Sequence, residues 1–267
     1  MVPARVVSLC PSLTETLFAI GAGDRVVGVT DWCTRPEEGV AALPKVGGTK
    51  TPDLGRILAL RPDLVVVNEE ENRLADVEIL REHRVPLLET FPRSASGAAA
   101  TVREMGRRLG CGERAEDLAR EIERAREEVA SACAGKARVR LACLVWRAPF
   151  MAVNRDTYIH DLLETAGGEN LFASDPQRYP RIPPERLREA APSAVLLTSE
   201  PYPFTALHAA EVRALCSLPS GRAVLVDGEL LSWYGPRTPE GLRYAARVLD
   251  RLRAGPPAEG SGGSSGI

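Results

Sequence analysis

The chain has 267 residues, 44% of them hydrophobic, and its 34 Lys and Arg nearly balance its 36 Asp and Glu to give a net charge of -2. A chain of this length can bury one large core or two moderate ones, so we expect a globular protein. With no basic stripe, and no apolar run near the roughly 20 residues that span a bilayer, the sequence argues against nucleic-acid binding and membrane insertion.

Short runs rich in Val and Leu alternate with amphipathic segments along the chain. The runs at 6–9, 26–29, 64–67, 87–88, 139–145, 194–197 and 223–226 are predicted to be buried strands. Helix-length segments, such as 13–19, 53–60, 74–83 and 158–166, lie between most of them. Alternating strands and helices favour parallel sheets covered by helices, which puts the chain in the α/β class.

One longer segment breaks this alternation. Residues 113–133 carry Leu118, Ile122, Ala125 and Val129 on one helical stripe, with glycines flanking both ends. We therefore predict two Rossmann-like lobes, residues 1–109 and 137–254, joined by one long rigid helix within 110–136. The Gly/Ser-rich segment 255–267 is predicted to be disordered or, in part, an addition used for expression.

The loops that follow the predicted strands are the candidates for ligand contact, because open parallel sheets bind ligands beyond the carboxyl ends of their strands. These loops hold all three tryptophans and half of the other aromatic residues, several beside arginines. That combination suits a flat ligand with polar groups, held by stacking and forked hydrogen bonds. Alternatively, several rings only close the bases of the lobes. The candidate contacts in these loops are Trp32, Asn68, Glu70, Glu71, Arg73, Trp146, Arg147, Phe150, Tyr202, Trp233, Tyr234 and Arg237.

The segment NEEENR at 68–73 has two interpretations. Asn68 or Asn72 could cap a helix that begins near Arg73, with the glutamates near its positive end. In the other interpretation, at least one glutamate projects between the lobes and accepts hydrogen bonds from a ligand. In the first helix, Ser12 and Glu15 predict a capping box.

Few residues point to catalysis, to a resident metal ion or to a disulfide. His83, His160 and His208 lie in or beside predicted helices, which gives no Ser-His-Asp arrangement, and no Walker loop, dinucleotide fingerprint or metal-ligand cluster is present. The six cysteines form no close pair, which indicates free thiols in a reducing compartment. We expect a cytoplasmic location; the alternative is a periplasmic or lipoprotein-tethered protein whose leader was trimmed.

A resemblance to a known family is carried by residues 5–38, beginning RVVSLCPSLTETLFAIGAGD, by KVGGTKTPDLGRILALRPDLVVV at 45–67, and by GGENLF at 167–172. These segments resemble the helical-backbone substrate-binding proteins of importers for cobalamin and iron siderophores, nearest to the cobalamin-binding members. The resemblance extends to about residue 252. It implies a class III periplasmic-binding-protein-like fold, in which two lobes bridged by one long helix bind a metal chelate between them with little hinge motion.

By position, the resemblance implies ligand contacts at Pro11 and Trp32 in the first lobe, and at Phe150, Tyr179 and the SWYGPR loop (232–237) in the second. Asn68 and Thr49 stand where the cobalamin-binding members have tryptophans, so the first lobe should offer a more polar surface. Several strand-end loops also resemble a subgroup of the family that lacks an export signal.

The same resemblance bears on a membrane partner. Family members use one glutamate on each lobe to contact arginines of an ABC-importer permease. Glu185 matches one of these glutamates, but Gly55 replaces the other, which weakens the expectation of a permease partner.

We predict a non-enzymatic protein that binds a corrinoid-like metal chelate, such as cobalamin, in a cleft between two lobes, with no covalently bound cofactor. A siderophore or haem is the alternative ligand. The alternative of another class is an enzyme acting on a cofactor precursor, with the carboxylates of Glu69, Glu70 and Glu71 as general acid and base. That reaction would require at least one of them to be partly desolvated.

Overall fold

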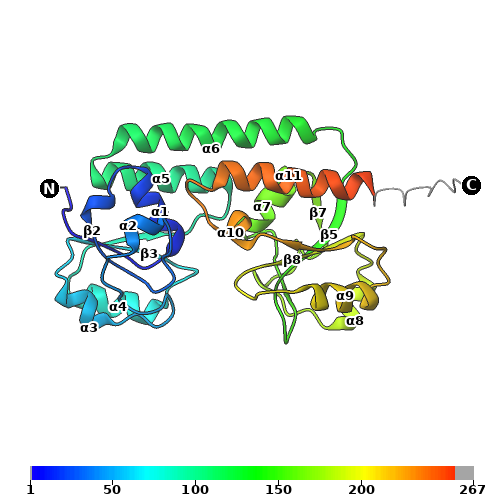
Figure 1. The fold of residues 1–267 in the computed structure, drawn as a ribbon, viewed down its shortest axis with the longest axis horizontal. Helices are drawn as coiled ribbons and strands as arrows, with labels where there is room; N and C mark the ends of the chain where they lie inside the picture. Colours follow the sequence, from blue (N-terminus) through cyan, green and yellow to red (C-terminus); the bar gives the residue numbers. More distant parts are fainter. Residues whose placement is uncertain (1, 256–267) are drawn as a thin grey trace, which may run out of the picture.

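The computed structural model describes residues 2–255 and has two α/β lobes, which lie side by side beneath a layer of long helices (Figure 1). In the N-terminal lobe, four parallel strands run in the order β2-β1-β3-β4, with bounds Val26–Val29, Val6–Ser8, Leu64–Asn68 and Leu87–Thr90. Strands such as β3 are buried at every residue, as a parallel sheet covered by helices requires. The predicted α/β class is confirmed.

The C-terminal lobe has five strands arranged around β5 (Val139–Trp146). On one side lie β8 (Ala194–Thr198) and β9 (Ala223–Val226), both parallel; on the other lie β7 (Gly168–Asn170), parallel, and β6 (Met151–Ala152), antiparallel. The predicted strands match within two residues at either end. The sequence does not predict β6 or β7, because such short strands carry no recognisable alternation.

Shorter helices surround both sheets. The N-terminal lobe has α1 (Pro11–Ala19), the 3-10 turn η1 (Gly23–Arg25), α2 (Glu37–Val40), α3 (Leu54–Ala59) and α4 (Leu74–Glu82); the C-terminal lobe has α7 (Tyr158–Thr165), α8 (Pro184–Glu189), α9 (Ala206–Leu215) and α10 (Gly228–Ser232). Across residues 2–255, no helix combines the length and apolar character that a membrane span needs. Of the predicted tail at 255–267, residues 256–267 lie outside the part of the chain that the structure describes.

The start of α1 differs from the prediction. The expected capping box would put Ser12 ahead of the first helical turn, but the helix begins at Pro11, with Cys10 as N-cap and no side-chain cap hydrogen bond. Proline is pre-organised for the first position of a helix, so the start moves ahead of Ser12. The Glu15 carboxylate consequently has a different partner, described below.

Three long helices connect the lobes. The longest, α6 (Gly112–Cys133), lies over α5 (Ala95–Leu109) and α11 (Thr238–Ala254), which follow one another beneath it (Figure 1). The face of α6 that packs on these helices is rich in alanine, which lets the helices approach closely. Its buried residues are Ala115, Ala119, Ile122, Ala125, Val129 and Cys133. The predicted connection through one long helix is confirmed, and α5 and α11 reinforce it.

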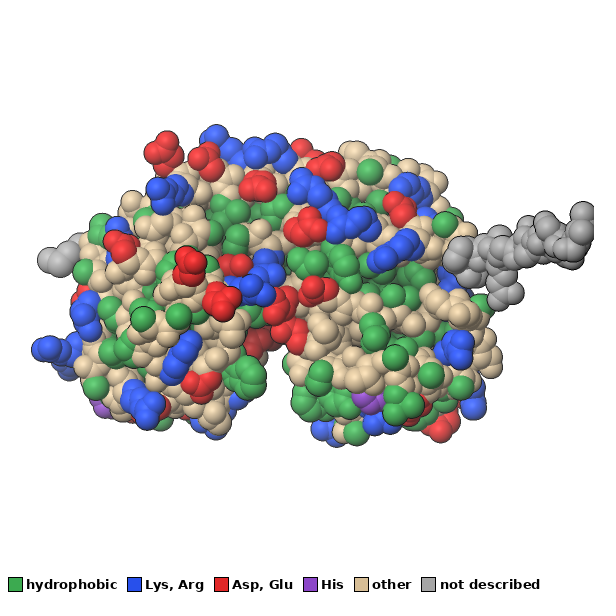
Figure 2. Space-filling model, viewed as in Figure 1, with side chains coloured by type: hydrophobic (Ala, Val, Ile, Leu, Met, Phe, Trp, Pro, Cys, Tyr) green, Lys and Arg blue, Asp and Glu red, His purple; other side chains and the backbone are tan. Residues whose placement is uncertain are grey.

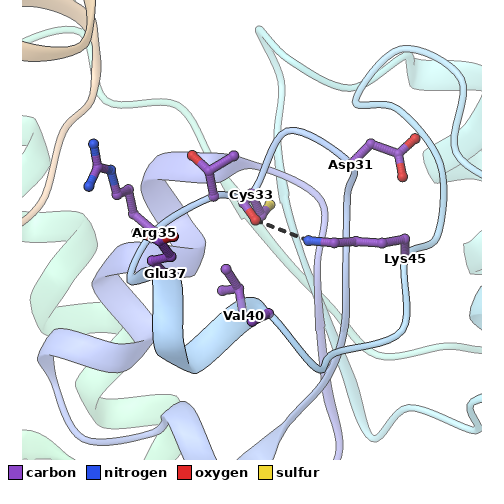
Figure 3. A pocket seen from close by; sticks show the side chains of 8 residues that line it. Asp31, Cys33, Arg35, Glu37, Val40 and Lys45 are labelled. Atoms are coloured by element: carbon purple, nitrogen blue, oxygen red, sulfur yellow. Dashed lines mark hydrogen bonds between the residues drawn. The ribbon is translucent and has the colours of Figure 1, made fainter.

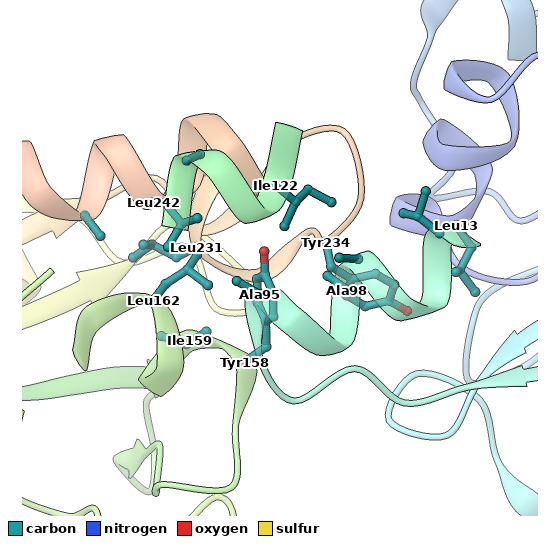
Figure 4. Close-up of a cluster of buried hydrophobic side chains, with 14 of the residues drawn as sticks. Leu13, Ala95, Ala98, Ile122, Tyr158, Ile159, Leu162, Leu231, Tyr234 and Leu242 are labelled. Atoms are coloured by element: carbon teal, nitrogen blue, oxygen red, sulfur yellow. The ribbon is translucent and has the colours of Figure 1, made fainter. Parts of the chain in front are cut away.

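Beneath α6, the two lobes share one apolar core. Its buried side chains run without interruption from Leu13 in α1 through Ala98 in α5 and Ile122 in α6 to Leu162 in α7 and Leu242 in α11 (Figure 4). Two further clusters fill the outer parts of the individual lobes. The lobes are therefore joined by packed side chains as well as by the chain itself.

The lobes also come into close contact at the backbone of Gly235, in the loop between α10 and α11. Gly235 has a φ of 96°, in the left-handed region that favours glycine. A Cβ at this position would collide with the hydroxyl group of Thr16 in α1. The backbone of this loop in the C-terminal lobe thus lies directly against the Thr16 side chain of the N-terminal lobe.

We expect Ile122→Ala to lower the free energy of unfolding by about 2–5 kcal/mol, because it leaves a cavity under α6 in the shared core. Chemical denaturation followed by circular dichroism should still give a single transition, moved to lower denaturant concentration. Glu121→Ala, on the exposed side of the same turn, is the matched control and should change stability by no more than about 0.5 kcal/mol. Separate transitions for the two lobes would contradict a shared core.

Candidate ligand site between the lobes

A cleft separates the two lobes on the side opposite α6, and acidic side chains gather at its inner end (Figure 2). Loops that follow strands of both sheets meet there. The loop after β3 supplies Glu70 and Glu71, the loop after β8 supplies Glu200, and the segment before α8 supplies Tyr179. The two lobes thus contribute polar groups to one site, as the strand-end rule predicts.

Asn68 shapes the acidic loop after β3. Its side-chain oxygen accepts hydrogen bonds from the backbone N–H groups of Glu70 and Glu71 at 2.9 and 3.1 Å, and its amide nitrogen donates to the Thr90 carbonyl at 3.1 Å. The side chain is buried and its polar atoms have protein partners. The predicted ligand contact at Asn68 is therefore not supported by its position, and its role is to fix the backbone that carries the two glutamates.

Asn72 closes the same loop from the other end. Its side-chain oxygen accepts from the Asn68 N–H at 2.9 Å, and its amide nitrogen donates to the carbonyls of Leu9 and Thr49 at 3.0 and 3.1 Å. The prediction that Asn68 or Asn72 caps the next helix is wrong, since the N-cap of α4 is Arg73, without a side-chain cap hydrogen bond. Both asparagines serve the loop because the turn leaves buried backbone groups that need partners.

Glu70 crosses from one lobe to the other. Its carboxylate accepts a hydrogen bond from the Tyr179 hydroxyl, and Nη2 of Arg178 lies 3.3 Å from the same oxygen. The Arg178 guanidinium also lies over the ring of Phe91, 4.4 Å from its centroid. Burial and the nearby Glu70 charge raise the pKa of the Tyr179 hydroxyl, so it stays protonated and acts as a donor.

Glu71 is the unpaired carboxylate of the site. Its side chain is half-buried, and no hydrogen bond or ion pair to its carboxylate is found among residues 2–255. Burial raises the pKa of this carboxyl group, the Glu70 charge raises it further, and Lys50 acts in the opposite direction. Glu71 is thus a hydrogen-bond acceptor that faces the cleft without a protein donor.

Glu200 occupies the matching position in the C-terminal lobe, two residues beyond β8. One carboxylate oxygen accepts hydrogen bonds from the Ser232 hydroxyl at 2.9 Å and from the Trp233 indole N–H at 2.7 Å. Burial raises the pKa of Glu200, and the charges of Glu229 and Glu71 raise it too, while the two hydrogen bonds lower it. Glu200 is not among the ligand contacts predicted from the sequence, although its place after a buried strand could have identified it.

Arginines border the site, but carboxylates already hold them. Nε of Arg237 lies 2.7 Å from Glu15 of the other lobe, and its Nη1 lies 3.3 Å from Glu229. The Arg237 guanidinium also lies over the Trp233 ring at 5.1 Å. Both Arg237 and Glu15 are largely buried, with 20% of each side chain exposed. This ion pair joins the lobes and leaves the Arg237 charge compensated.

A second pair of this kind links the lobes nearer the Phe91 side. Nη1 of Arg93 donates to the Asp156 carboxylate at 2.8 Å, and the other oxygen of Asp156 lies 3.3 Å from Nε of Arg178. Three arginines that border the cleft are therefore paired with carboxylates: Arg93, Arg178 and Arg237. The Glu71 carboxylate, by contrast, has no ion pair within the described part of the chain.

Two of the predicted tryptophans stand at the protein surface. Trp32, in the loop after β2, is 65% exposed, and Trp146, at the end of β5, is 40% exposed. The Trp146 ring packs edge-on against Tyr202 at 5.7 Å. Trp32 and Tyr202 lie in strand-end loops and Trp146 is the last residue of β5, and the contact of all three rings with a ligand stays a prediction.

Two other predicted aromatic contacts are buried. Phe150 belongs to the core of the C-terminal lobe. Tyr234 lies at the junction of the lobes, with its hydroxyl 3.8 Å from Cys10 Sγ and its ring edge-on to Tyr158 at 6.0 Å. Burial raises the pKa of the Cys10 thiol to about 12 and that of Tyr234 well above its ordinary value. These positions fit the alternative in which some of the rings close the bases of the lobes.

Two predicted arginine contacts are engaged within their own lobes. Arg73 forms an ion pair with Asp76 at 2.9 Å in the first turn of α4, and Arg147 forms one with Glu211 of α9 at 2.8 Å. Each guanidinium thus already has one carboxylate partner, and its contact with a ligand stays a prediction. Pro11 is half-buried at the first turn of α1, and its contact with a ligand stays a prediction.

A cavity of about 450 Å³ lies in the N-terminal lobe alone, in the loops after β2 (Figure 3). The Lys45 ammonium crosses it and donates to the Cys33 carbonyl at 3.1 Å. It is lined by Asp31, Cys33, Thr34, Arg35, Glu37, Val40, Ala41 and Lys45. Because the C-terminal lobe contributes nothing to it, this cavity is distinct from the site between the lobes.

Glu71→Gln should stabilise the empty protein at neutral and alkaline pH, because it removes a desolvated charge that has no partner. A carboxyl group with a raised folded-state pKa binds its proton more tightly in the folded than in the unfolded chain. Its contribution to stability is therefore lost as the pH rises through that raised pKa. We expect the melting temperature of the variant to exceed that of the wild type by a few degrees at pH 8.

The difference in melting temperature between Glu71→Gln and the wild type should shrink toward about pH 4.5, where the Glu71 carboxyl group titrates in the unfolded chain. Glu69→Gln changes the neighbouring exposed carboxylate and should show no such trend. A stabilisation that grows as the pH falls would contradict a raised pKa at Glu71.

The model of a family described as "Periplasmic binding protein" matches residues 6–213. A vitamin B12-binding protein of Pectobacterium carotovorum subsp. carotovorum (strain PC1) is 26% identical over 263 residues, which cover 97% of this chain and 92% of that protein.

Solved structures with the same fold include the periplasmic vitamin B12 binding protein BtuF of Vibrio cholerae, with a TM-score of 0.83 and 18% identity over 94% of this chain and 98% of that one. The periplasmic heme-binding protein RhuT from Roseiflexus sp. RS-1, in its apo form, has a TM-score of 0.80 and 26% identity over 93% and 98% of the two chains. The family match runs from β1 through most of α9 and so includes strands of both lobes. This chain belongs to the periplasmic binding protein family.

Proposed function

We propose that this protein binds a corrinoid-like metal chelate, such as cobalamin, in the cleft between its lobes, without turning it over. The observation that carries the proposal is the pair of carboxylates at equivalent strand ends, Glu71 beyond β3 and Glu200 beyond β8. Membership of a family of substrate-binding proteins supports the binding role, and the B12-binding relatives support this ligand class.

The charges at the site favour a corrinoid over haem. The periphery of cobalamin carries neutral amide groups, whose N–H donors suit a free carboxylate such as Glu71. Haem instead carries two propionate carboxylates, which would face Glu71 and Glu200 as like charges. An anionic ligand would need a free cation, yet the cleft arginines are already paired with carboxylates, and the Lys50 ammonium donates to the Glu70 carbonyl and offsets the Glu71 charge. A haem or an anionic siderophore is therefore the second candidate, supported by the heme-binding structural relative.

One observation also fits the enzyme alternative. Catalysis by the acidic loop would require a desolvated carboxyl group, and burial raises the pKa of Glu71. An unpaired acceptor in a ligand-binding cleft would show the same shift, so we retain binding as the proposal. Chromatography of the ligand recovered after prolonged incubation with the protein separates the two, since an enzyme would return a changed compound.

The relatives bear on location and partner. All six cysteines are free thiols, which fits a reducing compartment, but the similar solved structures are named as periplasmic proteins. Those names favour the exported alternative over the expected cytoplasm.

An ABC-importer permease is the partner typical of the family. Glu185 and Gly55 both lie exposed near the starts of helices in separate lobes, so docking through Glu185 alone stays a prediction.

Binding should be tested with dicyanocobinamide, cyanocobalamin and hemin, each titrated into purified protein by isothermal calorimetry. We expect saturable binding of at least one corrinoid with one ligand per chain, and hemin binding at least about tenfold weaker, because each unfavourable charge contact costs a factor of that order. Tighter binding of hemin than of either corrinoid would favour the second candidate. No binding of any of the three would remove metal chelates from the proposal.

Glu71→Gln and Glu200→Gln should change this selectivity. Removing one negative charge should narrow the preference for corrinoids over hemin by about tenfold, chiefly by strengthening hemin binding. Glu78→Gln, which changes an exposed carboxylate on the outer face of α4, is the matched control and should leave both affinities unchanged. An unchanged ratio of affinities in both cleft variants would show that the carboxylates do not select the ligand.

A further inference from the structure

Two consecutive residues of the C-terminal lobe, Arg178 and Tyr179, reach across the cleft to the N-terminal lobe. The Tyr179 hydroxyl donates to Glu70, and Arg178 lies 3.3 Å from the same carboxylate oxygen and 4.4 Å from the centre of the Phe91 ring. We call these two residues the strap. In the empty protein, the strap occupies an acceptor in the same loop as Glu71, where a bound ligand would lie.

The strap is held firmly in its own lobe. The backbone carbonyl of Arg178 accepts from the Asn154 N–H at 2.9 Å, and that of Pro180 accepts from the Ala152 N–H at 3.0 Å. Nε of Arg178 donates to the Asp156 carbonyl at 2.9 Å. Tyr179 thus stands between two hydrogen-bonded neighbours, and its side chain projects from a fixed backbone.

Glu70 is equally fixed on the other side, because the Asn68 side chain accepts a hydrogen bond from its N–H at 2.9 Å. Two rigid segments therefore meet through side chains alone. The phenol hydroxyl is a donor of the same kind as a ligand amide N–H, and only a side-chain rotation is needed to withdraw it from Glu70.

We propose that the contact between Tyr179 and Glu70 is a displaceable bridge: a ligand donor replaces the Tyr179 hydroxyl at Glu70, so the bridge competes with the ligand and slows its access to the cleft. This inference rests on the proposed function for its ligand class. Glu70 becomes a specificity-determining residue, since a ligand without a hydrogen-bond donor at this point would break the bridge and leave Glu70 with the Arg178 ion pair but no hydroxyl donor.

The arrangement also explains why the Glu70 carboxylate, which faces the cleft, has a hydrogen-bond donor in the ligand-free protein. Without Tyr179, the half-buried Glu70 carboxylate beside the like charge of Glu71 would keep Arg178 as a partner but would lose its hydroxyl donor. The bridge provides that donor until a ligand supplies its own donors. Arg178 can stay stacked on Phe91 while Tyr179 moves, so the strap need not leave the cleft wall.

The test compares Tyr179→Phe, which keeps the ring and removes the donor, with the wild type in stopped-flow binding of dicyanocobinamide and of hemin. We expect the association rate for dicyanocobinamide to rise about tenfold and its dissociation constant to fall, because a competing charge-assisted hydrogen bond is lost. Glu70→Gln should weaken corrinoid binding. Tyr244→Phe removes a hydroxyl that accepts from the Asp227 N–H at 2.8 Å within the C-terminal lobe, and should change neither rate.

Unchanged or slower association with Tyr179→Phe, or weaker binding, would overturn the bridge, because the hydroxyl would then contact the ligand directly or play no part. Failure of the wild type to bind any corrinoid would instead reject the proposed function. In that case a double-mutant cycle on the thermal unfolding of the empty protein, with Tyr179→Phe, Glu70→Gln and both together, tests the bridge alone. Additive effects would overturn it, and clear coupling would support it.

Discussion

The alanine-rich face of α6 is the constraint on which the rest of this structure depends. Because small side chains such as Ala119 and Ala125 bring α6 close to α5 and α11, one core runs under both lobes. A hinge through a flexible linker would let the lobes separate, whereas a packed layer of helices resists bending. The positions of the strand-end loops relative to one another are thus set before any ligand arrives.

Fixed lobes allow the cleft to hold charges that would be costly in a flexible protein. Glu71 and Glu200 are desolvated carboxylates on opposite walls, and each raises the free energy of the empty state. Ion pairs such as Glu15 with Arg237 keep the walls together against this repulsion. The empty site has more carboxylate charge than its own donors compensate, which is the physical basis for selecting a ligand that brings hydrogen-bond donors.

Much of the fold could be predicted from the sequence, because its signals are local. Runs such as 64–67 and the stripe through Ile122 and Val129 report burial directly through their periodicity. The site was less predictable. Trp32 and Phe150 both follow strands, yet one is exposed and the other buried, because burial depends on packing between segments far apart in the chain. Asn68 follows the predicted strand 64–67 but is the last residue of β3, and its partner at Thr90 is supplied by the neighbouring strand β4.

The bridges across the cleft were beyond sequence reasoning for the same reason. Nothing near Glu70 in the chain identifies Tyr179 as its partner, and nothing near Arg237 identifies Glu15. Gly235 is the clearest example, because its importance lies in what it lacks. With only a hydrogen atom facing Thr16, it sets the distance between the lobes at the smallest value the backbone allows. Any larger residue there would push the lobes apart, so the width of the cleft, and with it the thickness of the molecule it can hold, depends on a residue that has no side chain.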